Sequence, residues 1–126
     1  MYYYYMFSND FGDISMNEST LLISLKGKYD KNSCEDFITN LDEIYLSLDK
    51  EFIIISDLSK VNFLCIPSKI HYKIAEFFSQ NCQISEEYLK RIKIITNCST
   101  ISKILNGFFY LYKMPHPIVF EKYTLK

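Results

Sequence analysis

Residues 51–63 read EFIIISDLSKVNF and form the most informative segment of the chain. Residues 52–55 are apolar without alternation, and three of the four are β-branched. Such a short run is typical of a central strand of a parallel sheet, where both faces are buried. Asp57 follows and ends the predicted strand. We therefore expect an α/β fold with this strand near its centre.

The sequence on both sides of this segment alternates between strand and helix patterns. The predicted strands are residues 11–16, 20–29, 51–57, 92–96 and 118–120. The predicted helices are residues 32–48, 67–78 and 99–112, with a further helical turn at Ser85-Glu86-Glu87. The predicted order is ββαβαβαβ, which implies a mainly parallel mixed sheet with right-handed crossovers and helices packed on it.

The first predicted helix has the clearest pattern. Its apolar residues between positions 37 and 48 recur at a 3.6-residue period, which predicts one buried stripe. Asn32 or Ser33 is the expected N-cap, with Glu35 three residues after Asn32 as in a capping box. The two strands before it are expected to join at a turn around Asn17 and Glu18.

The length of 126 residues suits one domain. Hydrophobic residues make up 48% and aromatic residues 17%, which is enough for one core and excludes a disordered chain. Residues 1–10 differ from the rest because of their tyrosine run, whose strand propensity favours either an added strand or a frayed end. We therefore predict a lead-in segment at 1–10 and a single domain at 11–126.

Charge is distributed unevenly along the chain. Residues 1–58 carry four lysines and eleven acidic residues, a formal charge of −7, whereas residues 59–126 carry ten bases and four acids, a charge of +6. Solvated faces are the favoured interpretation, and a head-to-tail contact or a polar partner is the alternative. Arg91 is the only arginine. Because phosphate and base recognition prefer arginine, we expect no nucleic acid partner.

The residues that usually hold metals or cofactors do not form known patterns. The four cysteines contain no Cys-x-x-Cys pair, the two histidines form no His-x-x-x-His motif, and the three glycines are isolated. We therefore expect no metal and no cofactor. The start resembles no secretory signal, and no apolar run approaches the roughly 18 residues of a membrane span. These features predict reduced cysteines, a cytoplasmic location and no membrane insertion.

Cys65 is the strongest catalytic candidate that the sequence offers. It lies near the predicted start of a helix, where a thiolate is favoured. A cysteine nucleophile also needs a base, and nothing in the sequence places His71 or His116 beside it. We therefore predict no catalytic residue and a protein that is not an enzyme.

The segment Asp57-Leu58-Ser59-Lys60-Val61-Asn62-Phe63 after the central strand resembles the STAS domain. That fold occurs in bacterial anti-sigma-factor antagonists and in the cytoplasmic part of sulfate transporters. The similarity covers roughly residues 20–123 and extends to small stand-alone STAS-like proteins of unassigned role, through the proline-rich corner at 114–120. The resemblance implies a non-enzymatic protein-interaction or regulatory module. The alternative is a small-ligand or nucleotide-binding regulator.

The resemblance also indicates a switch loop, which departs from the family. In the antagonists the switch reads Asp-Ser-Ser-Gly, and a partner kinase phosphorylates the second serine. Here residues 65–68 read CIPS, so the phosphorylated position falls on Pro67, which cannot accept phosphate, and Ser68 is the alternative acceptor. The resemblance implies a structural role for Asp57, bonding the loop that follows. The predicted switch loop comprises Asp57, Ser59, Cys65, Pro67 and Ser68.

The third predicted helix is expected to present an interface. Phe109 and Tyr110 fall partly off its apolar stripe, and Tyr112 lies close to them in sequence. Exposed aromatic patches favour protein interfaces. We therefore predict Phe109, Tyr110 and Tyr112 as interface residues for a protein partner or a homo-oligomer.

Overall fold

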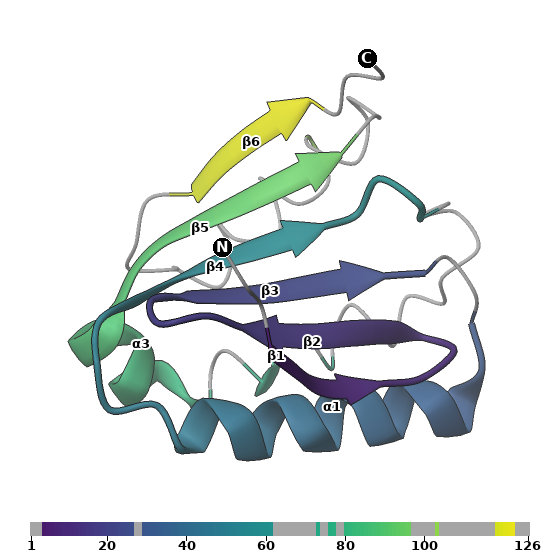
Figure 1. The fold of residues 1–126 in the computed structure, drawn as a ribbon, viewed down its shortest axis with the longest axis horizontal. Coiled ribbons are helices and arrows are strands. Elements are labelled where there is room, and N and C mark those ends of the chain that lie inside the picture. The colour runs from purple at the N-terminus through teal and green to yellow at the C-terminus, as the bar shows by residue number, and fades with distance from the viewer. Residues whose placement is uncertain are drawn as a thin grey trace.

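The computed structural model describes residues 4–26, 29–61, 73, 76–77, 80–96, 103 and 118–122. Its elements in chain order are β1 (Tyr4–Ser8), β2 (Gly12–Met16), β3 (Thr20–Leu25), α1 (Lys31–Leu46), β4 (Phe52–Asp57), α3 (Cys82–Tyr88), β5 (Leu89–Thr96) and β6 (Ile118–Lys122). Figure 1 shows these elements as one sheet with the helices packed against it. The α/β class predicted from the sequence is confirmed.

The sheet has six strands that lie side by side in chain order, β1-β2-β3-β4-β5-β6. β1, β2 and β3 pair antiparallel, whereas β3, β4, β5 and β6 pair parallel, so the sheet is mixed. The described chain begins with three strands rather than two, because β1 lies within the predicted lead-in segment and pairs with β2. The predicted second and third helices fall mostly outside the described residues.

Two asparagines shape the two hairpin turns. The Asn9 side-chain oxygen accepts hydrogen bonds from the backbone N–H groups of Phe11 and Gly12 at 2.9 and 3.2 Å. The Asn17 side-chain oxygen accepts in the same way from Ser19 and Thr20 at 3.1 and 2.8 Å. Such short polar side chains close a turn by replacing a backbone acceptor. The turn predicted at Asn17 is confirmed.

The N-cap of α1 lies two to three residues earlier than the sequence indicated. The N-cap is Asp30, which has an extended backbone conformation and whose carboxylate accepts a 2.9 Å hydrogen bond from the Ser33 N–H. The prediction of Asn32 or Ser33 as the N-cap was wrong. Ser33 lies inside the first turn of the helix, and its backbone N–H, which has no acceptor within the helix, donates to the cap residue instead. Hydrogen bonds from Ser33 hold the pKa of Asp30 below its ordinary value.

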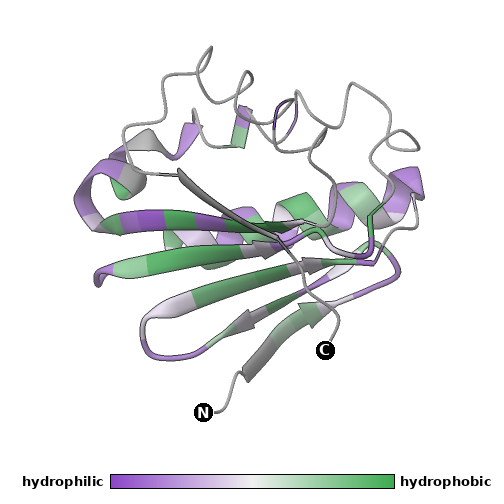
Figure 2. Cartoon of the chain, turned by 90° about the horizontal axis from the view of Figure 1, so that it is seen from above, coloured by the Kyte–Doolittle hydropathy of each residue, from purple (hydrophilic) through white to green (hydrophobic). Residues whose placement is uncertain are grey.

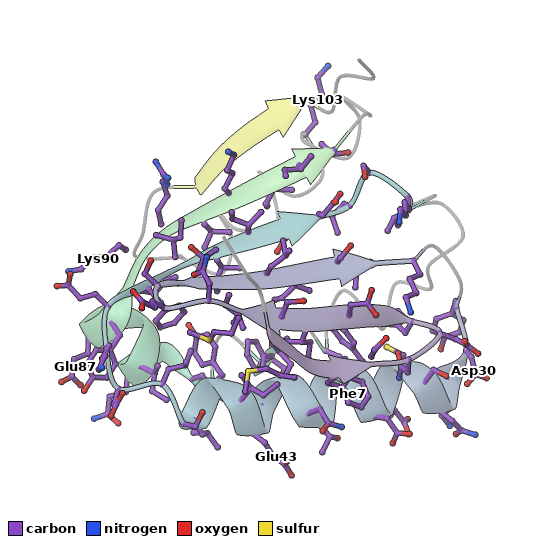
Figure 3. The ribbon with its side chains drawn as sticks, viewed as in Figure 1. Phe7, Asp30, Glu43, Glu87, Lys90 and Lys103 are labelled. Atoms are coloured by element: carbon purple, nitrogen blue, oxygen red, sulfur yellow. The ribbon has the colours of Figure 1, made fainter. Side chains whose placement is uncertain are left out.

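One side of the sheet carries the core. The buried stripe of α1 consists of Cys34, Phe37, Leu41 and Tyr45. These side chains join buried residues of β2 to β5 in one hydrophobic cluster, and side chains of α3 pack against the same cluster. Figure 2 shows α1 and α3 on the same side of the sheet. Figure 3 shows Glu43 on the outer surface of α1, pointing away from the strands.

The segment before α3 is tied to α1 by polar and aromatic contacts. Asn81 is buried, and its amide donates to a carboxylate oxygen of Asp42 at 2.8 Å and to the Phe77 carbonyl at 2.9 Å. The Phe77 ring meets the Tyr45 ring edge-on at 5.0 Å between centroids. This segment therefore lies on the same side of the sheet as α1.

Candidate functional site

Asp57 lies at the carboxyl end of β4 and holds the turn that follows. One carboxylate oxygen accepts hydrogen bonds from the Ser59 N–H at 3.0 Å and from the Ser59 hydroxyl at 2.6 Å. The Leu58 N–H donates to the Ile95 carbonyl at 2.8 Å, which joins the turn to β5. Asp57 thus bonds the loop that follows, as the resemblance implied.

The other predicted site residues lie outside the described part of the chain. They are Cys65, Pro67 and Ser68 of the predicted switch loop and Phe109, Tyr110 and Tyr112 of the predicted interface. The structure therefore brings together only Asp57 and Ser59 from these two sets.

The strand order determines which sides of the sheet are covered. A right-handed crossover between neighbouring parallel strands places its helix on one side, and the side changes only where the strand order reverses. From β3 to β5 the order does not reverse, and α1 and α3 lie on one common side. The ligand crevice of doubly wound sheets forms at such a reversal, so these strands do not provide one.

The opposite side of the sheet is called the open face here. Alternation along each strand and the pairing register identify its residues. On strands β2 to β5 the open face consists of Asp13, Ser15, Thr20, Leu22, Ser24, Ile53, Ile55, Asp57, Arg91, Lys93 and Ile95. Ser15 and Thr20 are buried, so the accessible part of this face lies mainly on Leu22 and on the residues of β4 and β5. Among the described residues no helix packs on it.

Aliphatic side chains occupy the middle of the open face. Leu22 is the register partner of Ile55, and Ile53 lies two residues before Ile55 on the same strand. All three are partly exposed, as is Ile95, whereas Ile54 on the covered face has no exposed surface. Parallel sheets are usually covered on both faces. This face therefore keeps apolar surface in contact with solvent.

Charged residues flank these aliphatic side chains at opposite ends of the strands. Arg91 is exposed and is the register partner of Ile53, while Asp57 is the register partner of Ile95. Ion pairs among the described residues join Lys26 to Asp13, Lys73 to Glu35 and Lys90 to Glu51, and none of these pairs includes Asp57 or Arg91.

A polar cluster formed by Ser8, Asn9, Asp13 and Lys26 lies at the β1 side of the open face. The Lys26 ammonium lies 3.0 Å from an Asp13 carboxylate oxygen and donates to the Asn9 carbonyl at 2.8 Å. The Ser8 hydroxyl donates to the same carboxylate. Burial acts to raise the pKa of Asp13, but the hydrogen bonds from Ser8 and Lys26, with the positive charges of Lys26 and Lys60, outweigh it and lower that pKa.

This lowered pKa predicts an acid-dependent loss of stability. A carboxylate whose pKa is lower in the folded state stabilises the fold above its unfolded pKa of about 3.9, and that contribution disappears as pH falls through the folded pKa. Asp13→Asn should therefore lower the urea midpoint at about pH 7, and this deficit should shrink progressively as pH falls below about 3.9 and through the folded-state pKa of Asp13. Glu43→Gln on the outer surface of α1 is the control. A deficit of Asp13→Asn that stays constant as the pH is lowered would contradict the electrostatic explanation.

The sequence contained a signal for the open face that the prediction missed. β4 is central as predicted, but the expectation of two buried faces was wrong, because Ile53 and Ile55 are partly exposed. In β5 the exposed or partly exposed Arg91 and Lys93 alternate with the buried Ile92 and Ile94. Such alternation is typical of a sheet with one solvated face.

The described fold and its open face define an α/β protein whose described helices cover one side of a mixed sheet. No protein-family model matches this chain, and a search of curated proteins finds no match. The resemblance to STAS domains therefore stays a prediction.

Two further features concern membranes and metals. No helix among the described residues is long and apolar enough to cross a membrane. In the same part of the chain, His, Cys, Asp and Glu side chains form no group of three or more that could hold a metal ion.

Proposed function

We propose that this protein is a non-enzymatic interaction or regulatory module of STAS-like type whose open face binds protein. The observation that carries the proposal is the partly exposed aliphatic set Leu22, Ile53, Ile55 and Ile95 on a sheet region of the kind usually covered on both faces. Contiguous apolar surface rimmed by polar residues is typical of protein interfaces. The rim here includes Asp57 and Arg91.

A small-ligand or nucleotide-binding regulator is the second candidate. Asp57 favours it, because carboxyl ends of parallel strands often face ligands in α/β sheets. The strand order weighs against it, since β3 to β5 continue in one direction and form no crevice of the doubly wound kind. One oxygen of the Asp57 carboxylate, Oδ1, is also already bonded to the backbone N–H and hydroxyl of Ser59, which leaves the other oxygen.

Capture from an extract of the native host tests the interaction proposal. We expect the wild-type protein and the outer-surface control Glu43→Arg to retain the same protein, and Ile55→Glu to lose it, because a charge at the centre of the open face prevents apolar contact. Circular dichroism of each bait confirms that it is folded. Equal retention by all three baits would place binding elsewhere and contradict the proposal.

Thermal unfolding in the presence of nucleotides tests the second candidate. A ligand that binds the folded state stabilises it by about 2.7 kcal/mol at a concentration 100 times Kd. We expect no rise in Tm with millimolar adenine and guanine nucleotides. A rise of several degrees that Asp57→Asn abolishes, together with no loss of capture by Ile55→Glu, would favour the nucleotide-binding regulator instead.

A further inference from the structure

We infer that the open face pairs with the open face of a second copy of this chain, forming a two-fold symmetric dimer. The inference deepens the proposed function and rests on it. Three observations support a second copy: the described helices of one copy, α1 and α3, lie on one side of the sheet, the centre of the other side is aliphatic, and its charges are arranged self-complementarily.

The described helices leave the open face of the sheet without a covering layer. The strands with parallel partners, β3 to β6, form most of the sheet, and parallel sheets are usually buried on both faces. Each copy supplies α1 and α3 to one side only. Two copies placed open face to open face would give the order helix, sheet, sheet, helix. The centres formed by Leu22, Ile53 and Ile55 would then cover each other.

The open face carries both an acidic residue, Asp57, and a basic residue, Arg91. This combination favours a second copy of the chain over a partner whose surface is charged with one sign. Arg91 lies four residues before Ile95, the register partner of Asp57, so the two charges are about 13 Å apart along neighbouring strands at about 3.3 Å per residue. A two-fold axis midway between them exchanges their positions. Asp57 of each copy then faces Arg91 of the other, giving two ion pairs per dimer.

The same geometry limits the strength of the dimer. The axis passes near the register pair Ile55 and Lys93, so the two Lys93 residues approach each other. Four strands about 4.8 Å apart, each with five residues, present roughly 300–400 Å² of sheet. A stable interface buries about 800 Å² per partner. We therefore expect a reversible dimer with Kd on the order of 10–100 µM, of the transient class.

Charge exchange tests the pairing directly. In homodimers of Asp57→Arg or of Arg91→Asp, both ion pairs become like-charged. In a mixture of the two variants, the heterodimer has one native pair and one reversed pair. Sedimentation at several hundred micromolar should show wild-type dimer, at least about tenfold weaker association of each variant alone, and recovery in the mixture. Glu43→Arg should associate as the wild type does.

A second measurement leaves the Asp57–Ser59 contact intact. Arg91→Lys keeps the positive charge and allows a carbodiimide to join it to a nearby carboxylate. In a mixture of ¹⁴N- and ¹⁵N-labelled protein, mass spectrometry should find Asp57 of one copy joined to the introduced lysine of the other. This experiment decides the matter if Asp57→Arg does not fold.

The outcomes separate this inference from the function on which it rests. A wild-type monomer at these concentrations, a mixture that associates no better than its components, or no intermolecular cross-link at Asp57 would overturn the dimer. If Ile55→Glu nevertheless loses a captured protein, the open face binds a different partner and the proposed function stands. If capture is also unaffected by Ile55→Glu, both the dimer and the proposed function fail.

Discussion

Tyr45→Ala is expected to lower the free energy of unfolding by about 3–5 kcal/mol, the typical cost of removing a large buried aromatic side chain. Tyr45 has no exposed surface. Its ring meets Phe52 of β4 and Phe77 edge-on, with centroid distances of 5.5 and 5.0 Å. Tyr45 thus joins α1 to the sheet and to the segment before α3, and alanine would leave a cavity between all three.

The adjacent residue provides the control for this change. Leu46 ends α1 and is 60% exposed, so Leu46→Ala removes an aliphatic side chain from the surface and should shift stability by less than about 0.5 kcal/mol. Urea unfolding measures both variants, with the comparison made at an unchanged slope against denaturant. If Tyr45→Ala lowered the free energy of unfolding by less than about 1 kcal/mol, the neighbouring core side chains would have to move into the space that the ring leaves.

The local elements of this fold were predictable because their signals lie in adjacent residues. The unalternating run at 52–55 indicated β4, and the 3.6-residue spacing of Phe37, Leu41 and Tyr45 indicated α1. The helix start was harder to place, because Asp30, Asn32 and Ser33 are all good caps. The choice among them depends on how the chain leaves β3, which composition does not encode.

The open face of the candidate site could not be predicted for a different physical reason. Ile53 and Ile55 are as apolar as Ile54, so the run alone suggests burial on both sides. Their partial exposure follows from the strand order, which places α1 and α3 on one side, and strand order depends on contacts between distant segments. The same holds for β1, since strand propensity alone left open whether residues 4–8 would pair or fray.

Gly12→Ala is expected to lower the free energy of unfolding by about 1–3 kcal/mol, the usual cost of overpacking. At a glycine whose backbone suits any residue, alanine normally stabilises by about 0.4–1 kcal/mol through the unfolded state. The backbone of Gly12 is outside the left-handed region, so conformation does not oppose the change. Space does, because an added Cβ would lie 2.7 Å from the Ser24 carbonyl oxygen.

A second substitution identifies which neighbour opposes the added methyl group. The Cβ would also lie 3.0 Å from the Leu25 and Phe37 side chains, which can shift, whereas the Ser24 carbonyl belongs to β3, which pairs on both sides. Phe37→Leu should therefore relieve only a minor part of the Gly12→Ala cost when a double-mutant cycle is measured by urea unfolding. Full relief would show that the aromatic ring is the obstacle. A stabilising Gly12→Ala would show that β2 and β3 can separate at this position, because the methyl group cannot otherwise fit against the Ser24 carbonyl.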